Sequence, residues 1–290
     1  MLEQREQTDW QFAREDLKQT PSVQAGWSVE REELDRAKAC SLIYSASRKL
    51  QLPQITSASA CVYLHRFYMR HSLKEFHHYN IAATCLFFAC KSEETLRKLD
   101  SFIPVIVYYA SKGNRRAPPG TTEFEKWRTV ILHTEVVLLE ALCFDMVVDH
   151  PHVPLIEIID KLRPTQQLSQ MAWNFIADFM RLPICLVYTP RLVAVAAVSL
   201  AVRVASGDVR AGLGDDGMWM EKVGAEQAVV HEVVQWLLGF YTREAQSRVT
   251  QNGPAESNAG SVAQTPASSP GSTMSPMPHA QQHSPPSVHH

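Results

Sequence analysis

The stretch IAATCLFFACKSEE, residues 81–94, is apolar or small for ten residues and then ends in one lysine and two glutamates. A helix of this composition has no polar face before its charged end, so it must lie inside a helical bundle. A second apolar helical segment, CVYLHRFYMR at residues 61–70, precedes it. The two segments predict a helical core whose functional surface lies where the charged end emerges.

The composition limits the classes of protein to consider. The chain has 290 residues, of which 45% are hydrophobic, enough for one large or two ordinary domains. Its formal net charge of −2 gives no bulk attraction to nucleic acid or membrane. No apolar run approaches the ~18 residues of a membrane span. We therefore expect a soluble nuclear or cytosolic protein for which direct nucleic-acid binding is disfavoured.

The six cysteines, at positions 40, 61, 85, 90, 143 and 185, form no C-x-x-C pair and show no zinc-finger spacing with histidine. Most of them fall within apolar helical patterns. This usage predicts buried free thiols in a reducing compartment, with no metal site and no disulfide.

Helical periodicity recurs along the chain, and strand-like alternation is scarce. Helices are predicted over residues 30–50, 54–71, 79–93, 98–110, 124–142, 153–162, 166–181, 190–205 and 225–243. From about residue 251 the chain turns to Pro, Ser, Ala, Gln and His, and its only charged side chain other than histidine is Glu256. Such a segment cannot bury a core, so a disordered Pro/Ser/His-rich tail is predicted over 246–290.

An internal repeat is visible among these helices. A single shift of the chain along itself places 166–180 on 54–68 and 193–203 on 81–91, and small and large apolar positions coincide in both pairs. The pattern predicts two helical domains related by duplication, with chance similarity between apolar helices as the alternative.

Several motifs together resemble a cyclin box: HRFYM at 65–69, KSEET at 91–95, EVVLLEALCFD at 135–145 and HPH at 150–152. The segment WQF at 10–12 resembles the segment that precedes the first box in the transcriptional cyclins of the K and T type. The resemblance implies an all-α protein of two tandem five-helix cyclin-box folds. Its expected parts are an N-terminal extension (1–29), a first box (30–150), a second box (151–245) and the tail (246–290).

The resemblance also implies a function without catalysis or cofactor. Cyclins bind a protein kinase and hold its mobile regulatory helix in the active position, a two-state element that a partner can bias. The implied partner is a cyclin-dependent serine/threonine kinase that phosphorylates the C-terminal domain of RNA polymerase II. The polymerase would be reached only through that kinase, in the nucleus, during transcription elongation.

The kinase-binding residues implied by the resemblance are Lys91 and Glu135, which would hydrogen-bond to kinase backbone groups, with Leu139 and Phe144 in the apolar contact around them. A plain surface ion pair between Lys91 and Glu135, worth under about 1 kcal/mol, is the alternative. The second repeat lacks the acidic pair of 93–94, so the interface is expected mainly on 30–145.

Two departures separate this chain from cell-cycle cyclins. Ser92 stands where many of them carry an aromatic residue after the motif lysine, so part of the apolar kinase contact must be made differently. The run RAKAC at 36–40 replaces the Met-Arg-Ala-Ile-Leu run of their substrate-docking groove. Lys38 in place of an apolar groove residue favours a transcriptional over a cell-cycle role.

Alternatives for the whole protein are the cyclin of a separate C-terminal-domain kinase complex, or of a cell-cycle kinase. An alternative from another class is a general transcription factor of the TFIIB kind, which shares the duplicated fold, binds DNA and normally carries an N-terminal zinc ribbon. The chain has no paired-cysteine N-terminus and is nearly neutral, which counts against that class.

The remaining motifs are weaker. LHRF at 64–67 resembles the kinase H-R-D motif but lacks its aspartate, so His65 is expected in the core and Arg66 paired with a helix end. His77 and His78 are expected at the surface without metal. The pair RR at 115–116 is a small basic loop, with solvation and RNA contact as its two interpretations.

Four tail residues each precede a proline: Thr265, Ser269, Ser275 and Ser284. They are candidate sites for phosphorylation by the bound kinase, although Ser-Pro also occurs in inert linkers.

Overall fold

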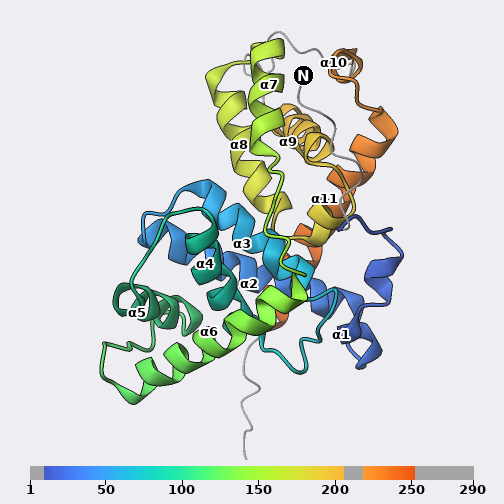
Figure 1. Cartoon of the computed structure of the whole chain (residues 1–290). Coiled ribbons are helices and arrows are strands. Elements are labelled where there is room, and N and C mark those ends of the chain that lie inside the picture. Colours follow the sequence, from blue (N-terminus) through green and yellow to red (C-terminus); the bar gives the residue numbers. More distant parts are fainter. Residues whose placement is uncertain (1–9, 206–217, 252–290) are drawn as a thin grey trace, which may run out of the picture. The chain divides into compact units, whose positions relative to one another are not determined.

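A computed structural model of the chain describes residues 10–205 and 218–251 (Figure 1). Within these ranges the ordered elements are helices and no strand occurs, which confirms the predicted all-α fold. Residues 246–251, predicted as the start of the disordered tail, instead belong to the last helix. The rest of the predicted tail, from position 252 onward, lies outside the described residues. The 3-10 helices are η1 (Asp16–Lys18) and η2 (Pro183–Leu186), and the α-helices are α1 (Pro21–Gln24), α2 (Val29–Lys49), α3 (Gln54–Phe67), α4 (His78–Ser92), α5 (Leu99–Ala110), α6 (Thr122–Ala141), α7 (His152–Leu162), α8 (Gln166–Phe179), α9 (Pro190–Val204), α10 (Met218–Lys222) and α11 (Gln227–Gln251).

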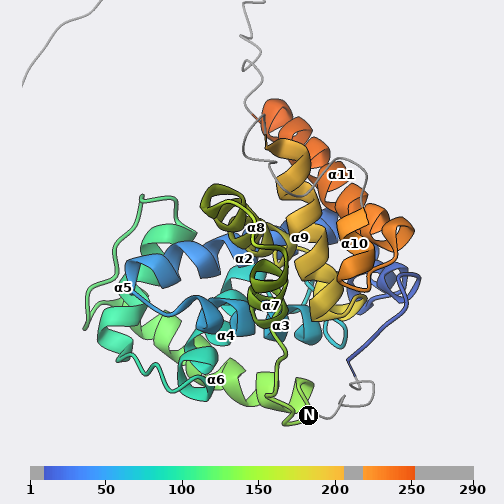
Figure 2. The same cartoon turned by 90° about the horizontal axis from the view of Figure 1, so that it is seen from above.

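The duplication predicted from the sequence is present in the helices. Helices α2–α6 form the first repeat and α7–α11 the second. Helices α3 and α8 have the same length, as do α4 and α9. The same shift along the chain places α3 on α8 and α4 on α9. In the first repeat α4 packs against α2, α3, α5 and α6, and in the second α9 packs against α7 and α8 (Figure 2). Each repeat is therefore built around one buried helix.

The central position of α4 follows from its sequence. Every residue from 81 to 90 is buried, on all sides of the helix. Burying a large apolar side chain stabilises a fold by about 1.5–3 kcal/mol, so a helix that is apolar all round gains most at the centre of a bundle. Other helices begin at hydroxyl caps, in which a side-chain oxygen accepts a backbone N–H of the first turn; the capping residues are Thr20, Ser28, Thr121, Thr165 and Thr189.

The predicted helix boundaries differ from the observed ones mainly at two places. Helix α3 ends at Phe67 rather than residue 71, and α11 continues to Gln251 rather than ending at 243. The sequence did not predict η1, α1, η2 or α10. Each has three to five residues, too few to display a helical period.

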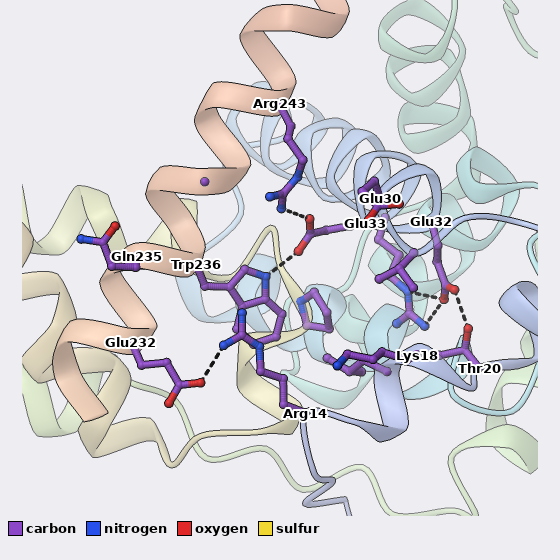
Figure 3. Close-up of a pocket in the computed structure, with 15 residues that line it drawn as sticks. Arg14, Lys18, Thr20, Glu30, Glu32, Glu33, Glu232, Gln235, Trp236 and Arg243 are labelled. Carbon is purple, nitrogen blue, oxygen red and sulfur yellow. Dashed lines mark hydrogen bonds and ion pairs between the residues drawn. The ribbon is translucent and has the colours of Figure 1, made fainter. Parts of the chain in front are cut away.

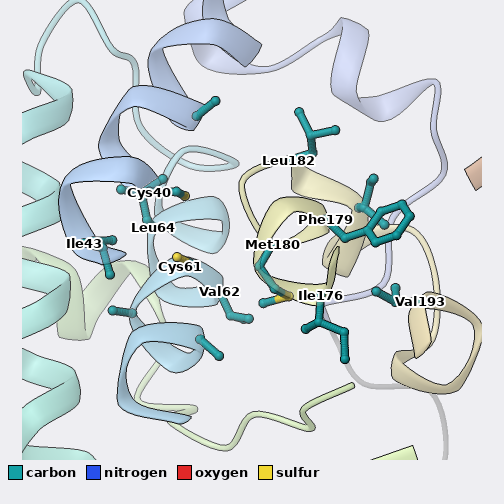
Figure 4. Close-up of a cluster of buried hydrophobic side chains, with 14 of the residues drawn as sticks. Cys40, Ile43, Cys61, Val62, Leu64, Ile176, Phe179, Met180, Leu182 and Val193 are labelled. Atoms are coloured by element: carbon teal, nitrogen blue, oxygen red, sulfur yellow. The ribbon is translucent and has the colours of Figure 1, made fainter. Parts of the chain in front are cut away.

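The two repeats share one hydrophobic core (Figure 4). Side chains of α2 and α3, such as Ile43 and Val62, belong to the same buried cluster as side chains of the second repeat, such as Phe179 and Met180 (Figure 4). His65, fully buried, places its Nε2 3.1 Å from the carbonyl oxygen of Met180. The described residues up to 250 accordingly form one compact unit. The proposed domain boundaries within it stay predictions.

The N-terminal segment covers this junction. Trp10 is buried, and the guanidinium groups of Arg66 and Arg70 lie 5.1 and 5.0 Å from the centre of its ring. The backbone N–H of Phe12 donates to the carbonyl oxygen of Leu186 at 2.8 Å. The segment is therefore attached to both repeats.

A cavity of about 390 Å³ lies where the N-terminal segment, α2 and α11 meet (Figure 3). Glu33 of α2 accepts a hydrogen bond from Trp236 Nε1 at 2.5 Å and another from Arg243. Arg14 forms an ion pair with Glu232 at 2.6 Å and lies over the Trp236 ring (Figure 3). These contacts join distant parts of the sequence, so they tie the first repeat and its extension to the last helix.

Two histidines at the junction of the repeats are kept neutral by burial: His150 in the linker and His152 at the start of α7. Burial lowers the pKa of His150 to about 4 and that of His152 to about 4. Neither ring nitrogen of His152 has a hydrogen-bond partner among the described residues, and the ring packs edge-on against Trp173.

These two histidines are expected to make the fold sensitive to acid. The unfolded chain takes up protons near pH 6.5 and the folded chain only near pH 4, so stability falls as the pH drops through that window. Urea unfolding should show a loss of about 1 kcal/mol per histidine between pH 7.5 and pH 5.5. The His152→Phe variant should be folded and should show a shallower pH dependence. A slope identical to that of the wild type would contradict this account.

Candidate functional site

The predicted pair is present at the surface of the first repeat. Lys91, in the last turn of α4, places its Nζ 2.5 Å from Oε1 of Glu135 in the neighbouring helix α6. The lysine side chain is 42% exposed and the glutamate 14%. The ammonium also lies 4.7 Å from the centre of the Phe87 ring. A cation at the C-terminal end of a helix and over an aromatic face is held in place from two sides.

The pair keeps unused hydrogen-bonding capacity. A lysine ammonium has three donors, and among the described residues it has one hydrogen-bond partner, Glu135. A carboxylate accepts several hydrogen bonds through its two oxygens. The two groups can therefore bind a carbonyl and an N–H of a partner while staying bonded to each other.

Apolar side chains surround the pair on α6. Leu132, Val136 and Leu139 follow one another at helical spacing, and the first two are 40% and 58% exposed. Leu139 is partly buried. Phe144, just after the helix, is 68% exposed. An exposed apolar surface with a polar centre is typical of a protein-binding site.

The outward position of Phe144 depends on an unusual backbone. Cys143 and Phe144 have φ values of 51° and 58°, in the left-handed region that bulky residues rarely adopt. The Phe144 N–H donates to the carbonyl oxygen of Leu139 at 3.1 Å, which ends α6. Strain of this kind is stored at functional sites more often than elsewhere.

Sequence reasoning missed part of this surface. Leu132 and Val136 belong to it. Met146 and Val147, shortly after Phe144 in the chain, are also 44% and 51% exposed. Leu96, just after the KSEET motif, is 69% exposed. The helical spacing of Leu132, Val136 and Leu139 is visible in the sequence. Spacing alone, however, does not distinguish an exposed apolar face from a buried one.

The motif residues next to Lys91 point inward. The Tyr63 hydroxyl donates to the carbonyl oxygen of Met146 at 2.7 Å and also lies 3.2 Å from Ser92 Oγ. Glu93 accepts from Ser59 at 2.5 Å, and the Ser59 hydroxyl also lies 3.0 Å from His150 Nε2. Ser92 and Glu93 therefore help to hold the segment after α6 and the linker between the repeats in place.

His65 and Arg66 lie where the sequence predicted. His65 is in the core, and Arg66 donates to the carbonyl oxygens of Asp145 and Val147, both at 3.1 Å, just after α6. His77 caps α4 by accepting the Tyr79 N–H at 3.3 Å. Across the described ranges no group of His, Cys, Asp and Glu side chains is arranged to hold a metal ion.

The cysteine prediction needs a correction. Four cysteines are buried and Cys185 is partly buried, but Cys143 is exposed. It lies just past the end of α6, where the left-handed turn directs the chain to the surface. None of the described helices is long and apolar enough to cross a membrane.

These observations define a duplicated α-helical protein whose first repeat has an exposed apolar face around an ion pair. The family model described as "Cyclin, N-terminal domain" matches residues 10–147. The relative Cyclin pch1 of Schizosaccharomyces pombe is 38% identical over 235 residues, covering 80% of this chain and 67% of the relative. The chain belongs to the cyclin family. Cyclins are regulatory subunits of kinases, so the prediction of a non-enzymatic protein is confirmed.

Other relatives support the transcriptional type. Cyclin-T1-5 of Arabidopsis thaliana is 31% identical over 270 residues, covering 89% of this chain and 45% of the relative. The chain spans about half the length of such plant relatives. The crystal structure of the yeast RNA Pol II CTD kinase CTDK-1 complex shares the fold, with a TM-score of 0.62, 17% identity and coverage of 85% of this chain and 77% of that one.

Proposed function

We propose that this cyclin binds and activates a cyclin-dependent serine/threonine kinase that phosphorylates the C-terminal domain of RNA polymerase II. Its similarity to the T-type cyclins supports this substrate, and the resemblance of its KSEET motif supports the mode of binding. The protein would act in the nucleus and promote transcription elongation. The observation that carries the proposal is the Lys91–Glu135 pair within an exposed apolar surface.

The geometry suggests how activation works. Kinase activity requires a strand lysine to pair with a glutamate on a mobile helix. A partner biases such a helix only if it binds the active position better than the inactive one. The paired side chains would bind the backbone next to that helix, and Leu139 and Phe144 would contact its apolar face. The ion pair fixes the position, and the apolar contact contributes most of the affinity.

The four candidate phosphorylation sites, Thr265, Ser269, Ser275 and Ser284, lie outside the described residues. Their modification by the bound kinase stays a prediction. Each phosphate would add about −1.5 to −2 charge to a segment with almost none.

The function is tested by purifying the tagged full-length chain from its own cells and identifying the kinase that accompanies it. The complex is expected to phosphorylate a peptide with several polymerase C-terminal repeats, and the kinase without the cyclin is expected to be nearly inactive. Histone H1 serves as the control substrate for cell-cycle kinases. Recovery of the chain without any kinase, or a clear preference for histone H1, would contradict the proposal.

A further inference from the structure

A second cavity lies in the first repeat, at the end of α4 that is away from Lys91. It has a volume of about 410 Å³ and lies between the start of α4, the end of α5 and the start of α6. Tyr79 and Lys91 are at opposite ends of α4, about 18 Å apart along its axis. This groove is therefore distinct from the kinase-binding pair. Its lining includes three aromatic rings, those of His77, Tyr79 and Trp127, and the amide side chains of Asn80 and Asn114.

The groove lies beside a basic segment of the chain. Residues 112–128 contain five lysines and arginines and two glutamates, a net charge of +3 in a protein whose formal net charge is −2. The basic residues are Lys112, Arg115, Arg116, Lys126 and Arg128, and all five are exposed. Arg115 lines the groove itself, and the other four lie near its lining residues in the sequence. The local excess of positive charge favours an anionic ligand.

Two of these basic residues already form ion pairs, and both pairs are weak. Arg115 pairs with Glu123 at 3.6 Å with its side chain 70% exposed, and Arg128 pairs with Glu125 at 3.4 Å with both side chains about half exposed. Exposed pairs of this kind contribute about 0–1 kcal/mol, so a stronger anion can displace the carboxylate. A guanidinium binds two oxygens of a phosphate in a fork geometry that a lysine cannot reproduce.

The rings and amides favour a particular peptide. Proline-rich segments form a pre-organised extended helix that docks into grooves lined by aromatic side chains. The Trp127 indole N–H and the side-chain amides of Asn80 and Asn114 are hydrogen-bond donors. Such donors can bind the carbonyl groups of a proline-rich segment. The positive end of the α4 dipole, at His77 and Tyr79, adds to the attraction for an anion.

The amount of charge separates a phosphopeptide from RNA. A phosphorylated side chain carries about −1.5 to −2, which Arg115 and the other exposed basic residues of 112–128 can neutralise. Single-stranded nucleic acid places one phosphate on each of about 4–16 nucleotides in a groove, which needs more cations. Glu123 in the wall of the groove also opposes a continuous phosphate backbone. From these observations we propose that the groove between α4, α5 and α6 binds a proline-rich peptide with phosphoserine or phosphothreonine next to proline.

This docking site goes beyond the proposed kinase activation and is tested on the full chain alone. The probe is a fluorescent peptide with two Ser-Pro steps, in phosphorylated and unphosphorylated forms, titrated in a binding assay by anisotropy. The phosphorylated form is expected to bind at least tenfold more tightly. Trp127→Ala and the double variant Arg115→Ala/Arg116→Ala should each weaken its binding at least tenfold.

Two controls keep the test decisive. The exposed basic residues Arg48 and Lys49 lie at the end of α2, and replacing both by alanine should leave binding unchanged. Because Trp127 is partly buried, circular dichroism of its variant is needed, and Asn114→Asp provides a surface change with the same expected loss. Equal binding of the two peptide forms, wild-type affinity in the groove variants, or tighter binding of a uridine oligonucleotide would each overturn the proposal.

Discussion

Replacing either Lys91 or Glu135 by alanine is expected to weaken kinase binding by roughly thirty-fold or more while leaving the cyclin folded. In the proposed complex both charges would be desolvated. Truncating one would leave the other unpaired, which typically costs about 2–5 kcal/mol. In the free chain Lys91 is 42% exposed, so the same pair adds about 0–1 kcal/mol to folding stability. The effect on binding should therefore greatly exceed the effect on stability.

The measurement is the affinity of each variant for the kinase, with stimulated kinase activity and thermal unfolding followed in parallel. Glu157 provides a matched control because it forms an exposed ion pair with Arg191, at 3.3 Å, on the second repeat. Glu157→Ala should bind the kinase like the wild type, since the interface is expected on the first repeat. Wild-type affinity in both Lys91→Ala and Glu135→Ala would remove the proposed site even though the fold is that of a cyclin.

The sequence predicted the fold best where burial is complete. The segment around α4 has no polar face, so its central position could be inferred without knowing its neighbours. The same reasoning indicated the second repeat. Helix α9 is buried on all sides over residues 193–202, and its apolar pattern superposes on that of α4. The short helices α1 and α10 could not be inferred, since tertiary contacts rather than a periodic pattern determine them.

The site was predictable only in part. Lys91 and Glu135 came from the resemblance to cyclins, because nothing in their separation along the chain implies contact. The exposure of Phe144 depends on two consecutive left-handed residues without glycine, which no propensity predicts. The contact of Glu33 with Trp236 joins residues 203 positions apart and requires the folded chain.

The largest effect on stability is expected at Arg36, which is 1% exposed. Its Nε lies 2.9 Å from Oε1 of Glu32, and its two terminal nitrogens donate to the carbonyl oxygens of His65 and Tyr68, both at 2.9 Å. These carbonyls lie at the C-terminal end of α3, where backbone oxygens lack partners within the helix. Arg36 thus neutralises a buried glutamate and caps a buried helix end. Glu32 also accepts a hydrogen bond from Thr20.

Arg36→Met should therefore reduce the free energy of unfolding by about 3–5 kcal/mol, because it leaves a buried carboxylate unpaired. That is a large part of the roughly 5–15 kcal/mol that stabilises a typical domain. Lys38→Met is the matched control on the same helix. Lys38 pairs with Asp35 at 2.7 Å, but its side chain is 47% exposed, so its loss should cost under about 1 kcal/mol.

The double variant Glu32→Gln/Arg36→Met separates charge from packing. If the unpaired charge is the main cost, neutralising Glu32 should restore part of the stability lost in Arg36→Met, even though one more native group has been removed. Urea unfolding of the four proteins, wild type included, measures this directly. Equal stability of Arg36→Met and Lys38→Met would contradict the account. A double variant less stable than Arg36→Met would show that the unsatisfied carbonyls at the end of α3, rather than the buried charge, dominate the cost.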